Sequence, residues 1–350
     1  MLPMKKIISL RIKGEYWDYL LKYDLLYLWG YDGTLEIYNW NKILYQVIHY
    51  EYSNDSNFDI GMHKYINTSK LEKLNFTNKK NVQNIVLNKE QMSRFLIKKS
   101  DIKTGELAIS INSYANKIIF NTDEGLYLSD LKNINSIKKI HESSFYFTDI
   151  GKYGKVSLSA GDEGIFGFQL EEKYKGIYDN LSDRVIKISD FHSNKAEWVG
   201  DYIYNTSFKE QDFLFNINKK NKENIYHKFR NSNDSVASVS WTYRNKIYRV
   251  LEDNILQEIS IKVDRNQKLV KSYKESRFQN WKGKIIDGAS AVFGTIVELE
   301  NALVVLSNEY GPETIPREPI RWKVYEETSR YKNLLCIIYD DELMINAYIN

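Results

Sequence analysis

The sequence predicts an all-β fold, a β-propeller of seven four-stranded blades. Three observations predict it. Aromatic residues make up 14% of the 350 residues, and alternating apolar runs recur in pairs around short polar turns. The pairs return at intervals of about forty to fifty residues, the period of a propeller blade. Aromatic side chains favour the pleated, half-buried surface of a strand, which agrees with this period.

The clearest hairpin lies near the amino terminus. Residues 25–31 and 34–40 are alternating runs, and Asp32-Gly33 joins them. Asp-Gly between alternating runs is a strong hairpin signal, because glycine accepts a positive φ without a Cβ clash and the turn matches the strand twist. This segment therefore predicts two adjacent antiparallel strands.

Six further pairs of runs follow the same rule, with an acidic, glycine or asparagine turn between the runs. They are residues 117–120 with 126–128, 156–159 with 165–168, 202–204 with 213–215, 247–250 with 255–259, 295–297 with 303–306, and 335–339 with 343–345. Seven hairpins predict seven blades, since a small sheet covers its faces only by packing between neighbours. Residues 6–12 form a strand that we expect to pair with the last repeat, so that the N- and C-terminal strands close the ring.

The interval between the first and second hairpins is too long for one repeat. We interpret residues 42–104 as an insertion within a single domain that spans residues 1–350. Residues 43–48 have the composition of a strand. A degenerate blade around residues 74–85 is the alternative interpretation of this interval.

A short helix is predicted near residues 88–99 of this insertion. Asn88 and Gln91 have the spacing of a capping box, in which each side chain bonds the backbone of the other. Met92, Phe95 and Leu96 would then share one helical face.

Charge and cysteine content limit the classes of function. The chain has 49 basic and 46 acidic residues, a net charge of +3, so nucleic acid is an unlikely partner. The single cysteine, Cys336, lies in an apolar run that predicts a buried strand, and a chain without disulfides suits a reducing compartment. We find no signal-peptide pattern and no apolar stretch of membrane-spanning length. The expected location is cytoplasmic, and the excess of Asn, Lys and Ile suggests an AT-rich bacterial genome.

The repeat pattern resembles WD-repeat and related propellers over residues 6–350. Tyr38-Asn39-Trp40, at the end of the first hairpin, is the segment nearest to that family's signature. The resemblance implies a toroid that presents loops on two faces to protein partners.

No catalytic residue, metal ligand or cofactor is predicted. None of the five histidines lies two to four residues from another, so local metal-ligand spacing is absent. Asp190 and His192 would lie on the same side of a strand, where a carboxylate could orient an imidazole, but a surface hydrogen bond is the simpler interpretation. The glycines of residues 161–167 are followed by a strand-like run rather than a helix, which indicates a tight turn and not a phosphate site. No Gly-x-Ser-x-Gly elbow occurs.

Four residues are candidates for partner binding: Arg317, Arg321, Trp322 and His192. The first three belong to the segment 316–323, next to Pro312, Pro316 and Pro319, which we expect to stiffen the connection into the last repeat. Arg and Trp are enriched at interaction hot spots. The alternative is a rigid connector whose Trp322 packs between blades and whose arginines pair with nearby acids.

The leading functional hypothesis is a non-enzymatic protein-binding scaffold or accessory subunit that uses the loops on the propeller faces. A second is an enzyme that acts on a carbohydrate or a phosphorylated small molecule in the central channel, which requires inward-facing charged side chains clustered there. A third, a nucleic-acid-binding propeller, requires a one-sided basic face despite the small net charge.

Overall fold

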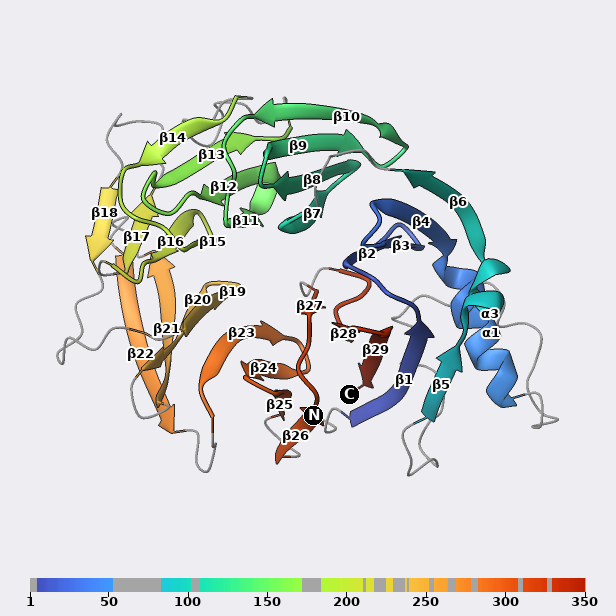
Figure 1. Cartoon of the computed structure of the whole chain (residues 1–350). Helices are drawn as coiled ribbons and strands as arrows, with labels where there is room; N and C mark the ends of the chain where they lie inside the picture. The colour runs from blue at the N-terminus through green and yellow to red at the C-terminus, as the bar shows by residue number, and fades with distance from the viewer. Residues whose placement is uncertain are drawn as a thin grey trace. The chain divides into compact units, whose positions relative to one another are not determined.

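The computed structural model describes residues 5–52, 83–101, 108–171, 184–209, 212–216, 225–228, 237, 239–251, 255–263, 269–277, 283–307, 311–325 and 329–349. Its strands form seven sheets, here called blades one to seven in chain order (Figure 1). Blade one contains β2 (Asp18–Lys22), β3 (Leu25–Trp29), β4 (Thr34–Asn39) and β6 (Leu96–Asp101). Blade two contains β7 (Ser110–Tyr114), β8 (Lys117–Thr122), β9 (Gly125–Asp130) and β10 (Asn133–His141). Blade three contains β11 (Phe147–Ile150), β12 (Lys155–Ser159), β13 (Ile165–Gln169) and β14 (Ile186–Ser189).

The remaining blades follow the same order. Blade four contains β15 (Lys195–Val199), β16 (Tyr202–Thr206), β17 (Phe213–Asn216) and β18 (Ile225–Lys228). Blade five contains β19 (Val239–Tyr243), β20 (Lys246–Leu251), β21 (Ile255–Val263) and β22 (Leu269–Arg277). Blade six contains β23 (Ile285–Ala291), β24 (Gly294–Leu299), β25 (Ala302–Ser307) and β26 (Gly311–Pro316). Blade seven contains β27 (Arg321–Val324), β28 (Leu334–Tyr339), β29 (Glu342–Ile349) and β1 (Lys5–Lys13), and β5 (Gln83–Leu87) adds a fifth strand to it.

The chain packs as two compact units. Unit 1 comprises Met1–Lys103 and Ala289–Asn350, and unit 2 comprises Thr104–Gly288, so the boundary lies within β23. The fold is the predicted seven-bladed β-propeller. That residues 1–350 form one domain stays a prediction.

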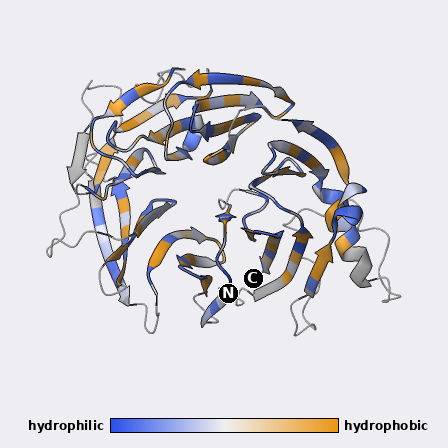
Figure 2. Cartoon of the chain, viewed as in Figure 1, coloured by the Kyte–Doolittle hydropathy of each residue, from blue (hydrophilic) through white to orange (hydrophobic). Residues whose placement is uncertain are grey.

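All seven predicted hairpins are present, and each forms the second and third strands of its blade. These two strands are flanked by strands on both sides, so their side chains are buried throughout β12, β16 and β28, whereas the outer strand β6 is largely exposed. Figure 2 shows hydrophobic and hydrophilic residues alternating along the strands. The hairpins could be recognised in the sequence because a strand with neighbouring strands on both sides has the strongest apolar pattern.

The predicted pairing of the chain's two ends is confirmed within unit 1. Strand β1 runs antiparallel to β29 in a register that joins Lys6 to Tyr348 and Lys13 to Glu342. On its other side β1 pairs in parallel with β5, from Ile8 with Gln83 to Ile12 with Leu87. The sequence did not indicate this parallel strand, which makes β1 an interior strand of its sheet.

The strand predicted at residues 43–48 is wrong, because this segment belongs to helix α1 (Trp40–Tyr52). Trp40, Ile43, Leu44 and Val47 are all buried, at the spacing of one helical face. The Asn39 side chain caps the helix by accepting a hydrogen bond from the Lys42 backbone N–H at 3.0 Å.

The short helix near residues 88–99 is present but ends early. Helix α3 (Lys89–Ser93) begins with the predicted capping box between Asn88 and Gln91. Met92 and Phe95 are buried as expected, but Leu96 is exposed because it starts strand β6.

The interval 42–104 therefore holds α3 and also β6, the fourth strand of blade one. Between β4 and β6 the chain also forms α1 and β5, and β5 pairs with β1 of blade seven. That this interval is an insertion stays a prediction. Most of the alternative blade around residues 74–85 lies outside the described residues.

The expected role of the prolines holds for only part of their segment. Pro312 and Pro316 lie in β26, at the edge of the blade six sheet, opposite Leu306 and Ala302 of β25. An edge strand tolerates proline because the missing N–H would face away from the sheet. Pro319 alone lies in the connection to β27.

Two further expectations concern Cys336 and the membrane. Cys336 is fully buried on β28, and burial raises the pKa of its thiol to about 12, as suits a core residue.

Within the described residues, no helix has the length and apolar content needed to cross a bilayer.

Candidate functional site

The four candidate residues lie where the chain passes from one blade to the next. His192 lies between β14 and β15, Arg317 between β26 and β27, and Arg321 and Trp322 begin β27. Because neighbouring strands are antiparallel, this connection and the turn between the second and third strands emerge at the same end of a blade. We call this the turn end of each blade.

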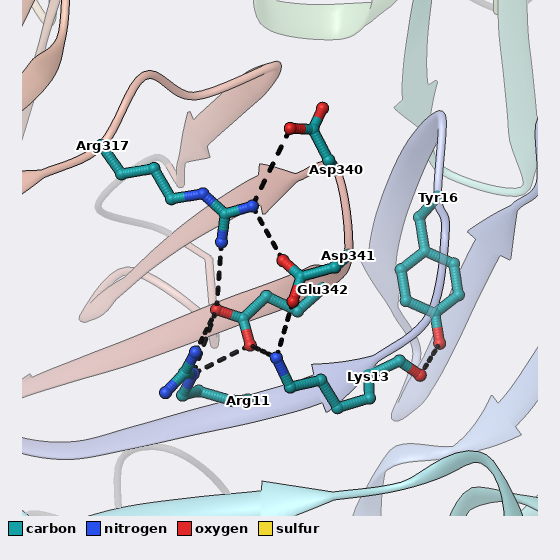
Figure 3. Close-up of polar contacts among 7 residues, drawn as sticks. All are labelled: Arg11, Lys13, Tyr16, Arg317, Asp340, Asp341 and Glu342. Carbon is teal, nitrogen blue, oxygen red and sulfur yellow. Dashed lines mark hydrogen bonds and ion pairs between the residues drawn. The ribbon is translucent and has the colours of Figure 1, made fainter.

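Arg317 belongs to an ion cluster at the turn end of blade seven (Figure 3). Its Nη2 lies 2.8 Å from Asp341 Oδ1 and 4.0 Å from Asp340 Oδ2, and its Nη1 lies 3.7 Å from Glu342 Oε1. The guanidinium stacks 4.4 Å from the centre of the Tyr339 ring. Arg317 is thus held against the β28–β29 turn, as the rigid-connector alternative expects.

Two cations from β1 complete this ion cluster. Arg11 binds Glu342 through both Nε and Nη2 at 2.7 to 3.0 Å. Lys13 Nζ lies 2.8 Å from Asp341 Oδ2 and 2.8 Å from Glu342 Oε2. Three cations and three carboxylates therefore tie the turn of blade seven to β1 and to the connection from blade six.

Acid should weaken this cluster. Hydrogen bonds from Lys13 and Arg317 lower the pKa of Asp341 to about 2. A folded-state pKa below the unfolded value contributes stability above about pH 4, which is lost as the pH falls toward about 2. The Asp341 side chain is 55% exposed, so solvent screening limits the contribution to about 1 kcal/mol or less. Urea unfolding of the wild type and of Asp341→Asn, at about pH 5 and about pH 2.5, should show a smaller loss of stability in the variant. Equal losses in the two proteins would contradict this.

Arg321 converges with Lys323 on a buried carboxylate, that of Asp18. Arg321 Nη1 lies 3.3 Å from Asp18 Oδ2, and Lys323 Nζ lies 2.6 Å from Asp18 Oδ1. Asp18 is fully buried. It belongs to the one Trp-Asp dipeptide of the sequence, and the Arg321 guanidinium stacks 4.3 Å from the Trp17 ring. The pairing joins blade seven to blade one.

Trp322 is also committed to packing. Its indole N–H donates to Glu298 Oε2 at 2.6 Å, and its ring packs against the core between blades six and seven. The partner-binding role of Arg317, Arg321 and Trp322 stays a prediction, but each has a structural role of its own.

His192 lies in a different setting, at the turn ends of blades three and four. Its Nδ1 is 2.8 Å from Ser207 Oγ, and its Nε2 is 3.8 Å from Asp162 Oδ1. Asp190 pairs with Lys187 at 2.5 Å, so Asp162 and not Asp190 is the carboxylate that faces the imidazole. Asp162 belongs to the tight turn predicted at residues 161–167, in which Gly161 and Gly164 adopt positive φ.

Two exposed aromatic residues lie near the connection that carries His192, and the sequence analysis missed both. Phe208 is 71% exposed and Tyr146 is 67% exposed, the highest values among the large hydrophobic residues that the structure describes. Tyr146 lies over Gly161, where a Cβ atom would come within 2.8 Å of the ring. Phe145, the neighbour of Tyr146, is fully buried. Adjacent side chains of an extended chain point to opposite faces, so one of two adjacent aromatic residues is expected outside. This pair was the sequence signal for Tyr146.

We call this surface the aromatic patch. It consists of Tyr146, Asp162, His192, Phe208 and Lys209. Lys209 closes it, since its Nζ lies 2.5 Å from Asp162 Oδ1 and 2.8 Å from Asp162 Oδ2. The patch thus presents two aromatic rings around a neutralised ion pair.

Unit 1 also contains a cleft of about 500 Å³. Its lining includes Lys13, Tyr16, Tyr31, Glu36, Tyr38 and Lys99. Burial raises the pKa of Tyr16 and of Tyr38, so both hydroxyls stay protonated and donate, to Lys13 O at 3.1 Å and to Glu36 Oε2 at 2.6 Å. The cleft has both charged and aromatic lining residues, and its Glu36 also pairs with Lys99 at 3.2 Å.

No metal centre is apparent where the structure can be described: no group of three or more His, Cys, Asp or Glu side chains there has an arrangement that could hold an ion.

Comparison with known proteins gives similarity of fold alone. No family model and no curated protein matches the sequence. The chain is similar to the β-propeller domain of Cps50 (Swd1) from Myceliophteria thermophila, with 10% identity, 66% of this chain and 79% of that chain covered, and a TM-score of 0.44. It is similar to the Pan2 WD40 domain of Neurospora crassa, with 8% identity, 98% and 95% covered, and a TM-score of 0.49. It is similar to the computationally designed Ika8 protein, with 8% identity, 98% and 99% covered, and a TM-score of 0.52.

The seven four-stranded blades define the class. The chain is a seven-bladed β-propeller.

Proposed function

We propose that this chain is a non-enzymatic protein-binding scaffold or accessory subunit whose partner contacts the turn ends of the blades. One observation carries the proposal: the two most exposed large hydrophobic side chains in the described chain, Tyr146 and Phe208, both belong to the aromatic patch. Exposed aromatics that are surrounded by polar groups are typical of interaction hot spots. The proposed location is the bacterial cytoplasm, on the grounds of sequence composition.

The patch is held rigidly, which favours binding. Gly161 and Ser193 exchange two backbone hydrogen bonds, at 3.0 and 2.9 Å, and so join the turn of blade three to the connection that carries His192. The Phe208 N–H donates to Asn194 Oδ1 at 2.9 Å in that same connection. A surface ordered before binding loses less conformational entropy when the partner arrives.

The unit 1 residues have a smaller place in this proposal. The Arg317 side chain is 37% exposed and its charge is balanced by carboxylates, so a contact of its own with a partner would contribute little to binding. Arg321 is ion-paired with Asp18, and Trp322 donates a hydrogen bond to Glu298. Alanine at either position would lower the stability of the fold, so it would not test binding alone. A test of binding should therefore leave both unchanged.

The experiment compares three forms of the tagged protein in quantitative pull-downs from the native cytoplasm. The wild type and Tyr146→Ala/Phe208→Ala are run beside the control Tyr23→Ala/Tyr153→Ala, which removes two tyrosines that are 52% and 39% exposed at turns between first and second strands. We expect a stoichiometric partner that the control retains and the patch variant loses by about tenfold or more. Equal recovery by the patch variant, or equal loss in the control, would refute the patch as the binding surface.

A further inference from the structure

A cluster of charged side chains lies on first strands of the blades and shares no residue with the aromatic patch. Asp149 is on β11, Lys195 and Glu197 are on β15, and Asp287 is on β23, all within unit 2. The first strands β7, β11, β15 and β19 contact one another in succession.

One cation serves three carboxylates in this cluster. Lys195 Nζ lies 3.2 Å from Asp287 Oδ1 and 3.4 Å from Glu197 Oε1, and it sits 5.2 Å from the centre of the Phe147 ring. Asp149 accepts backbone hydrogen bonds on both oxygens, from Ile150 and from Trp198, each at 2.8 Å. With every carboxylate ionised, the cluster would carry an excess of two negative charges.

Glu197 is the member whose hydrogen bonding is incomplete. The residue is only 9% exposed, and its Oε2 has no hydrogen-bond partner among the described residues. A buried carboxylate oxygen without a partner costs free energy that a donor could recover. The Asp287 side chain, 46% exposed, gives the cluster access to solvent.

The electrostatics of the cluster favour a proton on Glu197 when nothing is bound. The pKa of Glu197 is raised to about 8, because burial, together with the nearby carboxylates of Asp149 and Asp287, outweighs the opposing effect of Lys195. A cation that is brought close would stabilise the ionised form and release this proton.

We propose that Asp149, Lys195, Glu197 and Asp287 form a binding site for an organic cation, an ammonium or guanidinium group, which replaces the proton on Glu197. The donor hydrogens of such a group match the free Glu197 Oε2 and the solvent-facing carboxylate of Asp287. Binding forms hydrogen bonds to these oxygens, and the Glu197 proton passes to solvent. The site is separate from the proposed partner surface, and either proposal can fail alone.

The test is isothermal titration of the full chain with butylguanidinium and with its neutral isostere butylurea. We expect saturable binding of butylguanidinium. Butylurea should bind at least about tenfold more weakly. Near neutral pH, the enthalpy measured in buffers of different ionisation enthalpy should reveal release of a proton that approaches one per site.

Glu197→Gln supplies the matched variant. Glutamine is isosteric with the protonated acid, so the fold is expected to persist, which circular dichroism and thermal unfolding check. The variant should lose about tenfold in affinity and all of the proton release. Glu258→Gln removes a carboxylate of unit 2 that pairs with Lys246 at 2.6 Å, and it should leave both unchanged.

Three outcomes would overturn the proposal. They are no saturable binding of butylguanidinium to the wild type, equal binding of butylurea, or unchanged affinity in Glu197→Gln. Binding without proton release would equally contradict the replacement of a proton by the cation.

Discussion

Arg249→Met is expected to lower the free energy of unfolding by about 3–5 kcal/mol, because it leaves a buried carboxylate without its cation. Arg249 Nη2 lies 3.0 Å from Asp212 Oδ2, and the two side chains are 4% and 2% exposed. Methionine keeps much of the volume and removes the charge. Asp212 retains the hydrogen bond from the Tyr204 hydroxyl at 2.7 Å, which cannot neutralise it.

The loss of unfolding free energy in Arg249→Met should be larger at high pH than at low pH. Burial raises the pKa of Asp212, and Arg249 opposes that rise. Without the guanidinium, the folded-state pKa rises further above the unfolded value. The destabilisation should therefore be smallest below the unfolded pKa, about 3.9, and grow as the pH rises through the folded value.

Urea unfolding at about pH 4.5 and about pH 8 measures both effects. Lys246→Ala is the control on the same strand, because it removes the more exposed pair with Glu258 and should cost no more than about 1 kcal/mol. If Arg249→Met cost no more than Lys246→Ala, the buried pair would not contribute as argued.

Asp18→Ala is the second large effect, with an expected loss of about 3 kcal/mol. The change leaves Arg321 and Lys323 without their common carboxylate and removes the acceptor of the Tyr19 N–H at 2.7 Å. We place it at the low end of the range for broken buried pairs. The reason is that the two cations are 19% and 29% exposed and can regain water.

Thermal and urea unfolding of Asp18→Ala should be compared with Arg330→Ala. Arg330 pairs with Asp24 at 3.0 Å but is 57% exposed, so its loss should cost less than about 1 kcal/mol. Similar values for the two variants would show that the Trp-Asp dipeptide has no special part in joining blade seven to blade one.

The hairpins could be predicted because their information is local. Asp32-Gly33 and the alternating runs on either side specify both the turn and the faces of β3 and β4 without reference to distant residues. Repetition of that local signal then gave the number of blades. The capping box of Asn88 and Gln91 was legible for the same reason, since its two hydrogen bonds span three residues.

Helix α1 shows where local information fails. Ile43, Leu44 and Val47 fit a short apolar strand as well as one face of a helix, and the sequence does not choose between them. The segment is helical in the structure, because a helix lets Trp40, Leu44 and Val47 pack together on the apolar face formed by Ile8 and Leu10 of β1.

The candidate site was predictable in kind but not in detail. Sequence placed Arg317 in the connection into the last repeat, and it identified the arginines and Trp322 by residue type. It placed His192 on a strand, which is wrong, because His192 lies between β14 and β15. It could not show that Arg321 meets a carboxylate 303 positions away, or that His192 faces Asp162 instead of Asp190.

The sequence alone determined the repeat, the seven hairpins and the closing strand at the amino terminus, because turn chemistry and the two-residue period act over a few residues. The tertiary structure alone decided which charges meet and which aromatics stay outside. Lys195 and Asp287 are 92 positions apart, and Tyr146 differs from its buried neighbour Phe145 only in the face it occupies. Such contacts depend on how the blades pack. The charge or ring of a side chain is the same in every environment, so residue type alone does not predict its contacts.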